Sequence, residues 1–430
     1  MRYSIYNNLF SLSDKTKCIY NAASDKFVLL NSTLSKHLDT SANDLQNTCP
    51  IFFEELYRAN VIVDDDTDEY LALLHKSQSI KNNKEQFQLI VNPTLDCNLH
   101  CWYCYENHIK GSKITADTMI SILKFIDKVF EKQPLKSFSL LFFGGEPLLE
   151  FESVKIIIEH VIICCYRHQV NLHVSFTTNG VLIDRKTIDY LVQINADVGF
   201  QITLDGDRKH HDNTRFLSGN IGTYDTILNN VRLLLNNQID VLLRINYTAD
   251  NFLSLSSILE DLNNLKDAEK AHLKFDLQKV WQEKDNDLNE TGIMEMLRHG
   301  GFMVSTPNVN VDSLRFPCYA DYVNQLLINY NGDVFKCTAR DFNRSKRLGR
   351  LNKKGDVDWE GILSENRLQK YPPKNICKTC SIFPLCGGGC NQKRSETQDD
   401  VCVFDVDNKK INRIILDRFY QYIVRKRIIP

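Results

Sequence analysis

The sequence predicts an α/β protein whose core is an open, parallel (β/α)6 barrel. Between residues 86 and 285, short apolar segments alternate with longer segments of helical periodicity. This alternation is typical of parallel β/α units. Six such units form a partial barrel, with functional residues expected at the carboxyl ends of the strands. The expected strands are residues 87–91, 137–143, 172–177, 198–204, 241–247 and 273–280, and the expected helices are 116–131, 152–166, 185–194, 224–236 and 252–265.

Composition narrows the class of protein further. Of the 430 residues, 43% are hydrophobic and 25% are charged, which is ordinary for globular domains. No apolar run reaches the roughly 18 residues that a membrane helix needs, and the first residues do not resemble a secretory signal. We therefore expect a cytoplasmic protein without a membrane partner. The net charge of −2 also makes nucleic acid an unexpected partner.

Three cysteines lie together directly after the first expected strand. Cys97, Cys101 and Cys104 have the spacing C-x3-C-x2-C. Three thiolates can hold three corners of a 4Fe-4S cluster, which leaves one iron without a protein ligand. A zinc loop is the alternative, but structural zinc sites close all four positions with a second pair of ligands. The spacing therefore favours a cluster with an open iron.

Polar motifs follow the next two expected strands. Gly144, Gly145, Glu146 and Pro147 come directly after the second strand, and glycines at a strand end let the backbone approach a ligand closely. Asn179 stands at the end of the third strand. An ordinary turn between a strand and a helix would also explain the motif Gly144-Gly145-Glu146-Pro147. The motif indicates a binding site mainly because it follows the cysteine loop.

The fourth and fifth strands add further polar candidates. Thr203 ends the fourth strand and Arg215 follows it, and a guanidinium can bind a carboxylate through two hydrogen bonds. Arg244 and Asn246 alternate on the fifth strand, so they face the same side. For each of these residues, a satisfied polar network is an alternative to direct binding.

With these motifs the chain resembles the radical S-adenosylmethionine (SAM) superfamily. The resemblance implies that Cys97, Cys101 and Cys104 hold a 4Fe-4S cluster, whose open iron binds the amino and carboxylate groups of SAM. It also implies that SAM is cleaved to a 5′-deoxyadenosyl radical. The implied SAM contacts are Gly144, Gly145, Glu146 and Pro147 for the amino group, and Asn179, Thr203 and Arg215 for the ribose and carboxylate, with Arg244 and Asn246 as further candidates.

Seven more cysteines form a second group in the last third of the chain. They are Cys318, Cys337, Cys377, Cys380, Cys386, Cys390 and Cys402. A zinc ribbon would use only four of them. Between the first two of these cysteines, Asn331-Gly332 is a β-hairpin signal.

The spacing of this second group resembles the SPASM extension of the radical SAM superfamily. The resemblance implies two auxiliary 4Fe-4S clusters, and therefore three clusters in the whole chain. The implied ligands are Cys318, Cys337 and Cys390 for the first auxiliary cluster, and Cys377, Cys380, Cys386 and Cys402 for the second. The first auxiliary cluster then lacks a fourth cysteine ligand.

The first 85 residues differ from the barrel in pattern. Residues 17–21 and 26–30 are expected to form a hairpin, helical segments follow near 34–38 and 52–59, and the polar residues 76–85 read as a linker. The region resembles the small winged-helix-like elements that bind leader peptides in radical SAM enzymes acting on ribosomally made peptides. A cap over the first barrel strand is an equal alternative.

The chain is therefore expected to have five parts. These are an N-terminal hairpin and helix region that can recognise a leader peptide (residues 1–85), the radical SAM barrel (86–285), a bridge (286–317), the SPASM iron-sulfur domain (318–405) and a C-terminal helix (406–430). The remaining cysteines are expected to be small buried hydrophobic residues. They are Cys18, Cys49, Cys164 and Cys165.

The resemblance implies a peptide maturase that abstracts hydrogen from a side chain or Cα and then oxidises or cross-links the product. The implied partners are a precursor peptide or protein and an electron donor such as ferredoxin or flavodoxin. An anaerobic sulfatase maturase is the alternative, but the aspartate base of that subclass is replaced here by Thr338, with Asp341 three residues further on. A non-catalytic iron-sulfur electron carrier is a second alternative, although a carrier needs no open iron.

Overall fold

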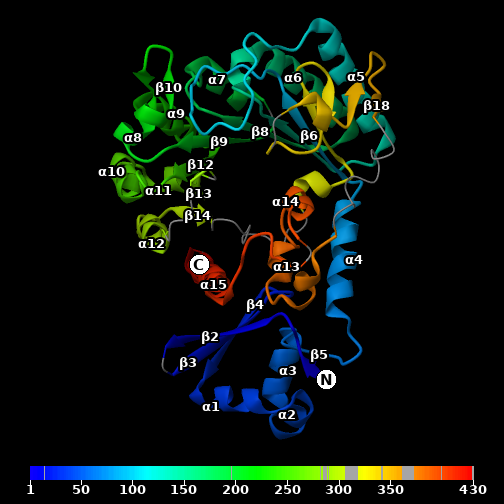
Figure 1. Ribbon diagram of the computed structural model, residues 1–430, viewed down its shortest axis with the longest axis vertical. Coiled ribbons are helices and arrows are strands. Elements are labelled where there is room, and N and C mark those ends of the chain that lie inside the picture. Colours follow the sequence, from blue (N-terminus) through cyan, green and yellow to red (C-terminus); the bar gives the residue numbers. More distant parts are fainter. Residues whose placement is uncertain are drawn as a thin grey trace. The chain divides into compact units, whose positions relative to one another are not determined.

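The computed structural model folds into two compact units (Figure 1). Unit 1 comprises Met1–Asn82, Asn308–Tyr322 and Leu368–Pro430, and unit 2 comprises Asn83–Pro307 and Val323–Arg367. The predicted iron-sulfur domain is thus shared between the two units. The structure describes residues 1–13, 15–194, 196–280, 282–283, 288, 290–305, 318–339, 342–360, 372–398 and 400–428. Much of the expected bridge, including residues 306–317, lies outside these ranges.

Unit 2 is built on an 11-stranded sheet in the order β14-β13-β12-β9-β8-β7-β6-β15-β16-β17-β18. In this order, neighbouring strands from β14 through β15 are parallel to one another. The pairs β15–β16, β16–β17 and β17–β18 are antiparallel. The six predicted strands are confirmed as β6 (Gln86–Asn92), β7 (Ser137–Phe142), β8 (Asn171–Thr178), β9 (Asp197–Leu204), β12 (Asp240–Tyr247) and β13 (Leu273–Lys279). The others are β14 (Met303–Ser305), β15 (Gln325–Asn329), β16 (Asp333–Phe335), β17 (Gly349–Leu351) and β18 (Val357–Trp359).

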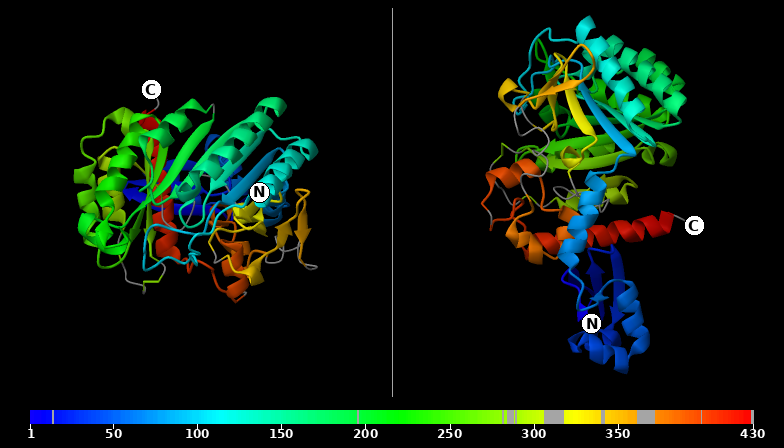
Figure 2. Two further views of the ribbon diagram at one scale, coloured as in Figure 1. Left: turned by 90° about the horizontal axis from the view of Figure 1, so that it is seen from above. Right: turned by 90° about the vertical axis from the view of Figure 1, so that its right-hand side faces the viewer.

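Amphipathic helices cover one face of this sheet (Figure 1 and Figure 2). They are α5 (Ala116–Lys132), α6 (Phe151–His168), α7 (Arg185–Gln193) and α9 (Tyr224–Asn236). In α5, the apolar residues Ile122, Ile126 and Val129 recur at helical spacing and are buried against the strands. Shorter elements complete the unit: η2 (Pro147–Glu150), α8 (Arg208–Thr214), β10 (Phe216–Leu217), β11 (Ile221–Gly222), α11 (Asp267–Lys270), α12 (Thr291–His299) and η5 (Arg344–Lys346).

The predicted helix over residues 252–265 is wrong in its extent. The segment instead forms the 3-10 helix η3 (Phe252–Ser256) followed by the short helix α10 (Ser257–Asp261). The serine hydroxyls explain the break, because Ser254 Oγ donates to Asn251 O at 2.8 Å and Ser257 Oγ donates to Ser254 O at 2.6 Å. Such local side-chain bonds compete with regular helix geometry.

The two faces of the parallel strands differ in polarity. In β9, Phe200, Ile202 and Leu204 are buried against the helices, whereas Gln201 and Thr203 point the other way and are half-buried. This follows from the period of two along a strand. The face away from the helices is therefore polar and reached by solvent at the ends of β8, β9 and β12.

The N-terminal part of unit 1 is a three-stranded antiparallel sheet of β2 (Asn7–Ser13), β3 (Thr16–Asn21) and β4 (Lys26–Asn31). The predicted hairpin is confirmed as β3 and β4, and β2 is an additional strand. One face of the sheet packs on a layer of short helices through Ile19 and Leu30. That layer consists of α1 (Ser32–Ser35), η1 (Lys36–Asp39), α2 (Ala42–Thr48) and α3 (Pro50–Arg58), followed by β5 (Ile62–Val63), which pairs with β1 (Arg2–Tyr3).

The other face of this sheet packs on the helix α15 (Asn408–Ile428), which confirms the predicted C-terminal helix. Phe419 lies 5.8 Å from Phe10 and 5.2 Å from Phe27, measured between ring centroids. Arg418 forms a partly buried ion pair with Asp25. The C-terminal helix is therefore fixed to the N-terminal sheet.

The polar residues expected to be a linker belong mostly to the helix α4 (Glu69–Lys81). The side chain of Asp68 caps this helix by accepting a hydrogen bond from Leu71 N at 2.9 Å. Leu73 packs in a core with Phe383 of the short helix α13 (Phe383–Cys386). The remaining short elements of unit 1 are η4 (Tyr319–Asp321), η6 (Asn375–Thr379) and α14 (Asn391–Glu396).

None of the helices in the described part of the chain combines the length and apolar character that a membrane span requires.

Candidate functional site

A cavity of about 180 Å³ lies at the carboxyl ends of the parallel strands in unit 2. The predicted residues that line it are Cys97, Cys101, Cys104, Gly144, Gly145, Asn179, Thr203, Arg215, Arg244 and Asn246. These residues come from the loop after β6, from the ends of β7, β8, β9 and β12, and, for Arg215, from the end of α8. The fold thus brings together motifs that are far apart in the sequence.

The two glycines after β7 are required by a close approach of two backbone segments. A Cβ atom added to Gly145 would lie 2.2 Å from Asp96 O, and one added to Gly144, whose φ is +113°, would lie 2.3 Å from Thr94 O. Gly145 N donates to Thr94 O at 3.2 Å and Glu146 N donates to Asp96 O at 2.8 Å. The glycine turn therefore supports the start of the cysteine loop.

Glu146 is completely buried and does not line the cavity. Its carboxylate accepts hydrogen bonds from Thr178 Oγ1 at 2.7 Å, Asn179 N at 2.8 Å and Leu148 N at 3.0 Å. Burial raises the pKa of Glu146, and these donors oppose the rise. The side chain positions the end of β8, while Pro147 is buried at the start of η2.

Tyr103, which stands between two of the loop cysteines, is the centre of a buried hydrogen-bond network. Its hydroxyl lies 2.8 and 2.9 Å from the carboxylate oxygens of Asp205, to which it donates. The same oxygen accepts from Arg215 Nη1 at 2.8 Å and Asn246 Nδ2 at 3.0 Å. Burial raises the pKa of Asp205 to about 6, and the charge of Arg215 opposes this rise. The network ties the cysteine loop to β9 and β12.

The role of Tyr103 was missed in the sequence because its partners are distant in the chain. The structure also shows that Arg215, a predicted SAM contact, already bonds Tyr103 and lies 3.5 Å from Asp205. Arg244 donates from Nε to Asn246 Oδ1 at 2.9 Å and has no carboxylate within ion-pair distance among the described residues. Arg244 is therefore better placed than Arg215 to receive a carboxylate from a bound molecule.

Glu106 is a second residue that the sequence did not single out. Its side chain lines the cavity, only 9% of its surface is exposed, and neither carboxylate oxygen has a hydrogen-bond partner among the described residues. Burial raises its pKa to about 9. The side chain is therefore a neutral carboxylic acid near pH 7, and a ligand in the cavity that carries a positive charge would favour its ionised form.

The four cysteines predicted to hold the second auxiliary cluster lie together in unit 1. Burial raises the pKa of the Cys386 thiol to about 12, and the nearby thiols of Cys377, Cys380 and Cys402 contribute to the rise. Cys386 ends α13, whose apolar residues pack on the N-terminal sheet. Of the three ligands predicted for the first auxiliary cluster, Cys318 and Cys390 belong to unit 1 and Cys337 to unit 2. That assignment remains a prediction.

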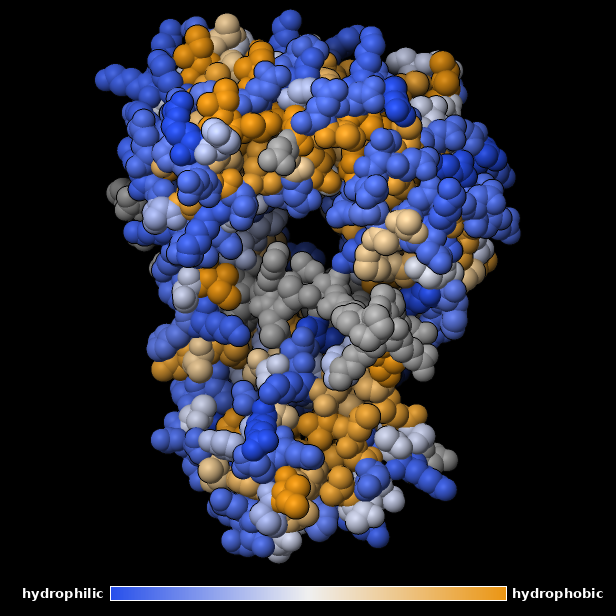
Figure 3. All heavy atoms as spheres, turned by 180° about the vertical axis from the view of Figure 1, so that it is seen from behind, coloured by the Kyte–Doolittle hydropathy of each residue, from blue (hydrophilic) through white to orange (hydrophobic). Residues whose placement is uncertain are grey.

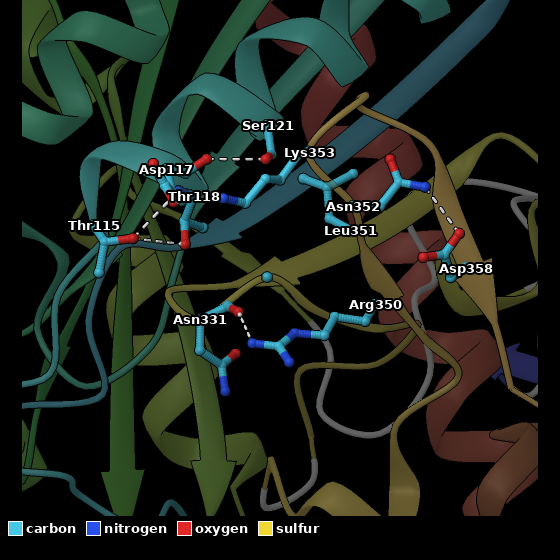
Figure 4. Close-up of a pocket in the computed structure, with 11 residues that line it drawn as sticks. Thr115, Asp117, Thr118, Ser121, Asn331, Arg350, Leu351, Asn352, Lys353 and Asp358 are labelled. Carbon is cyan, nitrogen blue, oxygen red and sulfur yellow. Dashed lines mark hydrogen bonds and ion pairs between the residues drawn. The ribbon is translucent and has the colours of Figure 1, made fainter.

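A larger cavity of about 500 Å³ lies between the start of α5 and the strands β17 and β18 (Figure 4). Polar side chains that line this cavity form ion pairs and hydrogen bonds with one another. Lys353 Nζ lies 3.2 Å from Asp117 Oδ2, and Asn352 Nδ2 donates to Asp358 Oδ1 at 2.8 Å. None of the predicted cysteine or SAM-binding residues lines it, and we assign it no chemistry.

The fold and the cavity define a class of protein that comparison confirms. Residues 91–265 match the model of the radical SAM superfamily. This part of the chain is therefore a radical SAM domain. The zinc interpretation of the cysteine loop is thereby set aside.

Two curated relatives are similar over most of the chain. Radical SAM cyclopropyl synthase TigE from Paramaledivibacter caminithermalis is 25% identical over 337 residues, covering 70% of this chain and 67% of the relative. A cysteine-type anaerobic sulfatase-maturating enzyme from Clostridium novyi is 22% identical, covering 72% of this chain and 89% of the relative.

Solved structures share the fold. The enzyme anSMEcpe with bound AdoMet matches with a TM-score of 0.60 and 18% identity, covering 78% of this chain and 98% of that one. Streptococcus suis SuiB bound to S-adenosylmethionine matches with a TM-score of 0.51 and 16% identity, covering 93% and 98%.

The cofactors of the superfamily are SAM and a 4Fe-4S cluster, and the residues of the cavity fit both. Cys97, Cys101 and Cys104 line the same space, so they can supply the three thiolates that leave one iron open. Arg244 offers a positive group, and Glu106 offers a carboxyl group whose ionised form a cation in the cavity would favour, so a molecule with both charges, such as SAM, would match the two residues.

Proposed function

We propose that this enzyme is an oxidative maturase of a ribosomally made peptide. The observation that carries the proposal is the cavity in which three cysteines meet the unpaired Glu106 and the polar ends of the strands. When bound, the reduced cluster and SAM supply a 5′-deoxyadenosyl radical, which removes a hydrogen atom from a side chain or Cα of the peptide.

The residues of the chain have separate tasks in this proposal. Cys97, Cys101 and Cys104 hold the cluster, Arg244 receives the carboxylate of SAM, and Glu106 faces its positively charged groups. Asn179 and Thr203 are assigned to the ribose. The remaining residues act by positioning these groups. The start of the cysteine loop and the end of β8 are supported by Gly144, Gly145, Glu146 and Pro147. The middle of the cysteine loop is held by Tyr103, Asp205, Arg215 and Asn246.

Support for a peptide substrate comes from the relatives. The structural neighbour anSMEcpe was crystallised with AdoMet and the Cp18Cys peptide, with a TM-score of 0.57. TigE is named as a cyclopropyl synthase. We propose two auxiliary 4Fe-4S clusters on the seven C-terminal cysteines, three clusters in total, and an external electron donor such as ferredoxin or flavodoxin.

The N-terminal sheet provides a place for a leader peptide. In the described residues, β2 and β4 are its edges and pair only with β3. An extended peptide can add to such an edge through main-chain hydrogen bonds, while pockets beside it read the side chains. Apolar residues are visible on the surface of this part of the chain (Figure 3), and the exposed ones include Leu9 on β2 and Leu29 on β4.

A sulfatase maturase is the second candidate, favoured by the similarity to the Clostridium novyi enzyme. Thr338 stands where that subclass is expected to have its aspartate base, and Asp341 lies outside the described residues. This difference favours the peptide maturase.

Anaerobic turnover followed by mass spectrometry tests the proposal. The iron-loaded enzyme, SAM and dithionite are incubated with a precursor peptide encoded beside the gene or with a sulfatase peptide. We expect 5′-deoxyadenosine and a loss of two hydrogens per modification in the precursor. Conversion of a Cys or Ser in the sulfatase peptide to formylglycine would support the second candidate, and no deoxyadenosine with either peptide would contradict both.

A further inference from the structure

Three potential metal ligands meet on the helical layer of unit 2. Asp127 belongs to α5, and His160 and Cys164 belong to α6. The ligand atoms of these residues all lie within 4.8 Å of one another. His160 Nε2 is 2.8 Å from Asp127 Oδ1, and Cys164 Sγ is 3.6 Å from the same oxygen. None of the three lines the cavity at the cysteine loop.

The positions of the three side chains follow from the helices that hold them. His160 and Cys164 are four residues apart, so they lie on the same face of α6. The helices α5 and α6 are neighbours in the layer (Figure 1), and this brings Asp127 opposite that face. Cys164 is 3% exposed, whereas the side chains of His160 and Asp127 are 25% and 42% exposed. The thiol of Cys164 is therefore the buried ligand of the group, and the ring of His160 and the carboxylate of Asp127 are its solvent-exposed ligands.

Two of the three distances between ligand atoms are close to those of a tetrahedral metal site, and the third, from His160 to Cys164, is within 4.8 Å. Bonds of about 2.0 Å to nitrogen and oxygen and about 2.3 Å to sulfur place neighbouring ligand atoms roughly 3.3 to 3.5 Å apart. The distance from Cys164 Sγ to Asp127 Oδ1 already fits, and the distance between His160 Nε2 and Asp127 Oδ1 would have to increase by about half an ångström. A thiolate, an imidazole and a carboxylate together favour zinc-class ions over magnesium or calcium.

The alternative is a surface hydrogen bond between His160 and Asp127 beside a cysteine that merely fills space. Cys165 provides the matched comparison, because it is next in the sequence, 6% exposed and packed in the apolar core. Cys164 differs from it by facing a carboxylate and an imidazole. A thiol with only a packing role would behave like Cys165 when metal is added.

We propose that Asp127, His160 and Cys164 bind one zinc-class divalent ion on the outer side of the helical layer, with the fourth position open to water. The ion would join α5 to α6 and would be a metal separate from the iron-sulfur clusters. This inference does not depend on the substrate proposed above.

Zinc retention by the iron-loaded enzyme tests the site. The wild type, C164S, H160N and the control C165A are dialysed anaerobically against buffered zinc, and iron and zinc are counted in each. We expect wild type and C165A to retain one zinc more per chain than C164S and H160N, with equal iron in all four. Added zinc should also raise the midpoint of thermal unfolding of the wild type and C165A, but not that of C164S and H160N. The inference is overturned if all four proteins retain the same amount of zinc.

Zinc-edge X-ray absorption separates this site from zinc in an emptied cluster position. We expect one sulfur at about 2.3 Å and lighter ligands at about 2.0 Å. A spectrum with three or four sulfurs would assign the zinc to the cluster cysteines and would contradict the proposal, even if the zinc counts differed between variants. D127N, which keeps the shape of the side chain but removes its charge, should weaken retention without changing the sulfur count.

Discussion

Glu106 is the residue whose environment most directly indicates a missing ligand. Burial raises the pKa of its carboxyl group to about 9, so the group is neutral near pH 7 in the unliganded protein, and the ammonium and sulfonium of SAM would favour its ionised form. Hydrogen bonds to charged groups contribute about 1.5–3 kcal/mol. We therefore expect Glu106→Ala to weaken SAM binding by roughly 10- to 100-fold without loss of iron.

The measurement is anaerobic SAM binding to the iron-loaded variants, with the exposed neighbour Asn107→Ala as control. Glu106→Gln keeps the shape and one hydrogen-bond acceptor, so an intermediate loss would assign part of the effect to the charge. If Glu106→Ala binds SAM like the wild type but loses affinity for the peptide, the carboxylate belongs to the substrate site and our assignment of it to SAM is wrong.

His211 makes a prediction about pH. The ring is completely buried, Nδ1 accepts from Asp205 N at 3.2 Å, and Nε2 lies 3.0 Å from Thr223 Oγ1. Burial lowers the pKa of His211 well below its usual value, and the charge of Arg215 lowers it further. The unfolded chain therefore binds a proton below about pH 6.5 that the folded chain excludes.

The free energy of unfolding should consequently decrease as the pH falls below about 6.5, by up to about 1.4 kcal/mol per pH unit from this group. His211→Gln removes the titrating ring, so its stability should depend less steeply on pH between 7 and 5. Anaerobic chemical denaturation measures both slopes. The exposed His75→Gln is the control, and equal slopes in wild type and His211→Gln would show that His211 is not the source.

The strands and helices of the barrel were predictable because each has a strong local pattern. The apolar runs of β6 to β13 and the amphipathic repeat of α5 are visible in the sequence and match the structure closely. The helix α8 was missed because its residues, RKHHDNT, have no apolar repeat. The strand β14 has only three residues, too few for an alternating pattern.

The pairing of β15 with β6 shows a different limit of sequence reasoning. The hairpin of β15 and β16 was indicated by Asn331-Gly332 and is confirmed. The parallel pairing of Leu326 with Leu89 joins segments more than two hundred residues apart, and nothing local specifies it. The same applies to the site: the ligand motifs are local, whereas the network of Tyr103 and the burial of Glu106 arise only from tertiary structure.

The turn after β7 predicts a sensitive glycine. Gly145→Ala would place a Cβ 2.2 Å from Asp96 O, so the start of the cysteine loop must move, at a cost of about 1–3 kcal/mol or more. We expect the variant to lose about four irons per chain. Gly199→Ala is the control, because its added Cβ would make ordinary contacts at 3.7 Å or more. Equal iron in both variants would contradict the proposed role of the turn.

Within unit 1, the first and last parts of the chain fold as one body. Tyr6, Tyr20 and Leu73 share a core with Phe383 and Ile415, and the predicted second auxiliary cluster lies on cysteines beside that core. Deleting residues 1–82 should therefore expose the core and remove about four irons, while the barrel cluster and SAM cleavage persist. Full retention of iron would show that the cysteine-rich segment folds without the N-terminal sheet.

Because this deletion would disturb more than the leader site, the leader hypothesis is better tested at single positions on the edges of the N-terminal sheet. Leu9 on β2 and Leu29 on β4 are 51% and 56% exposed, so replacing either with Asp leaves the core intact but places a charge where an added strand would pack. We expect Leu9→Asp or Leu29→Asp to weaken binding of the precursor about 10-fold or more, with iron content and SAM cleavage unchanged.

Ile51→Asp on α3, where 81% of the side chain is exposed, is the control away from the edges. If both edge variants modify the full precursor as fast as the control, and the wild type modifies a leaderless peptide equally well, the sheet does not bind the leader.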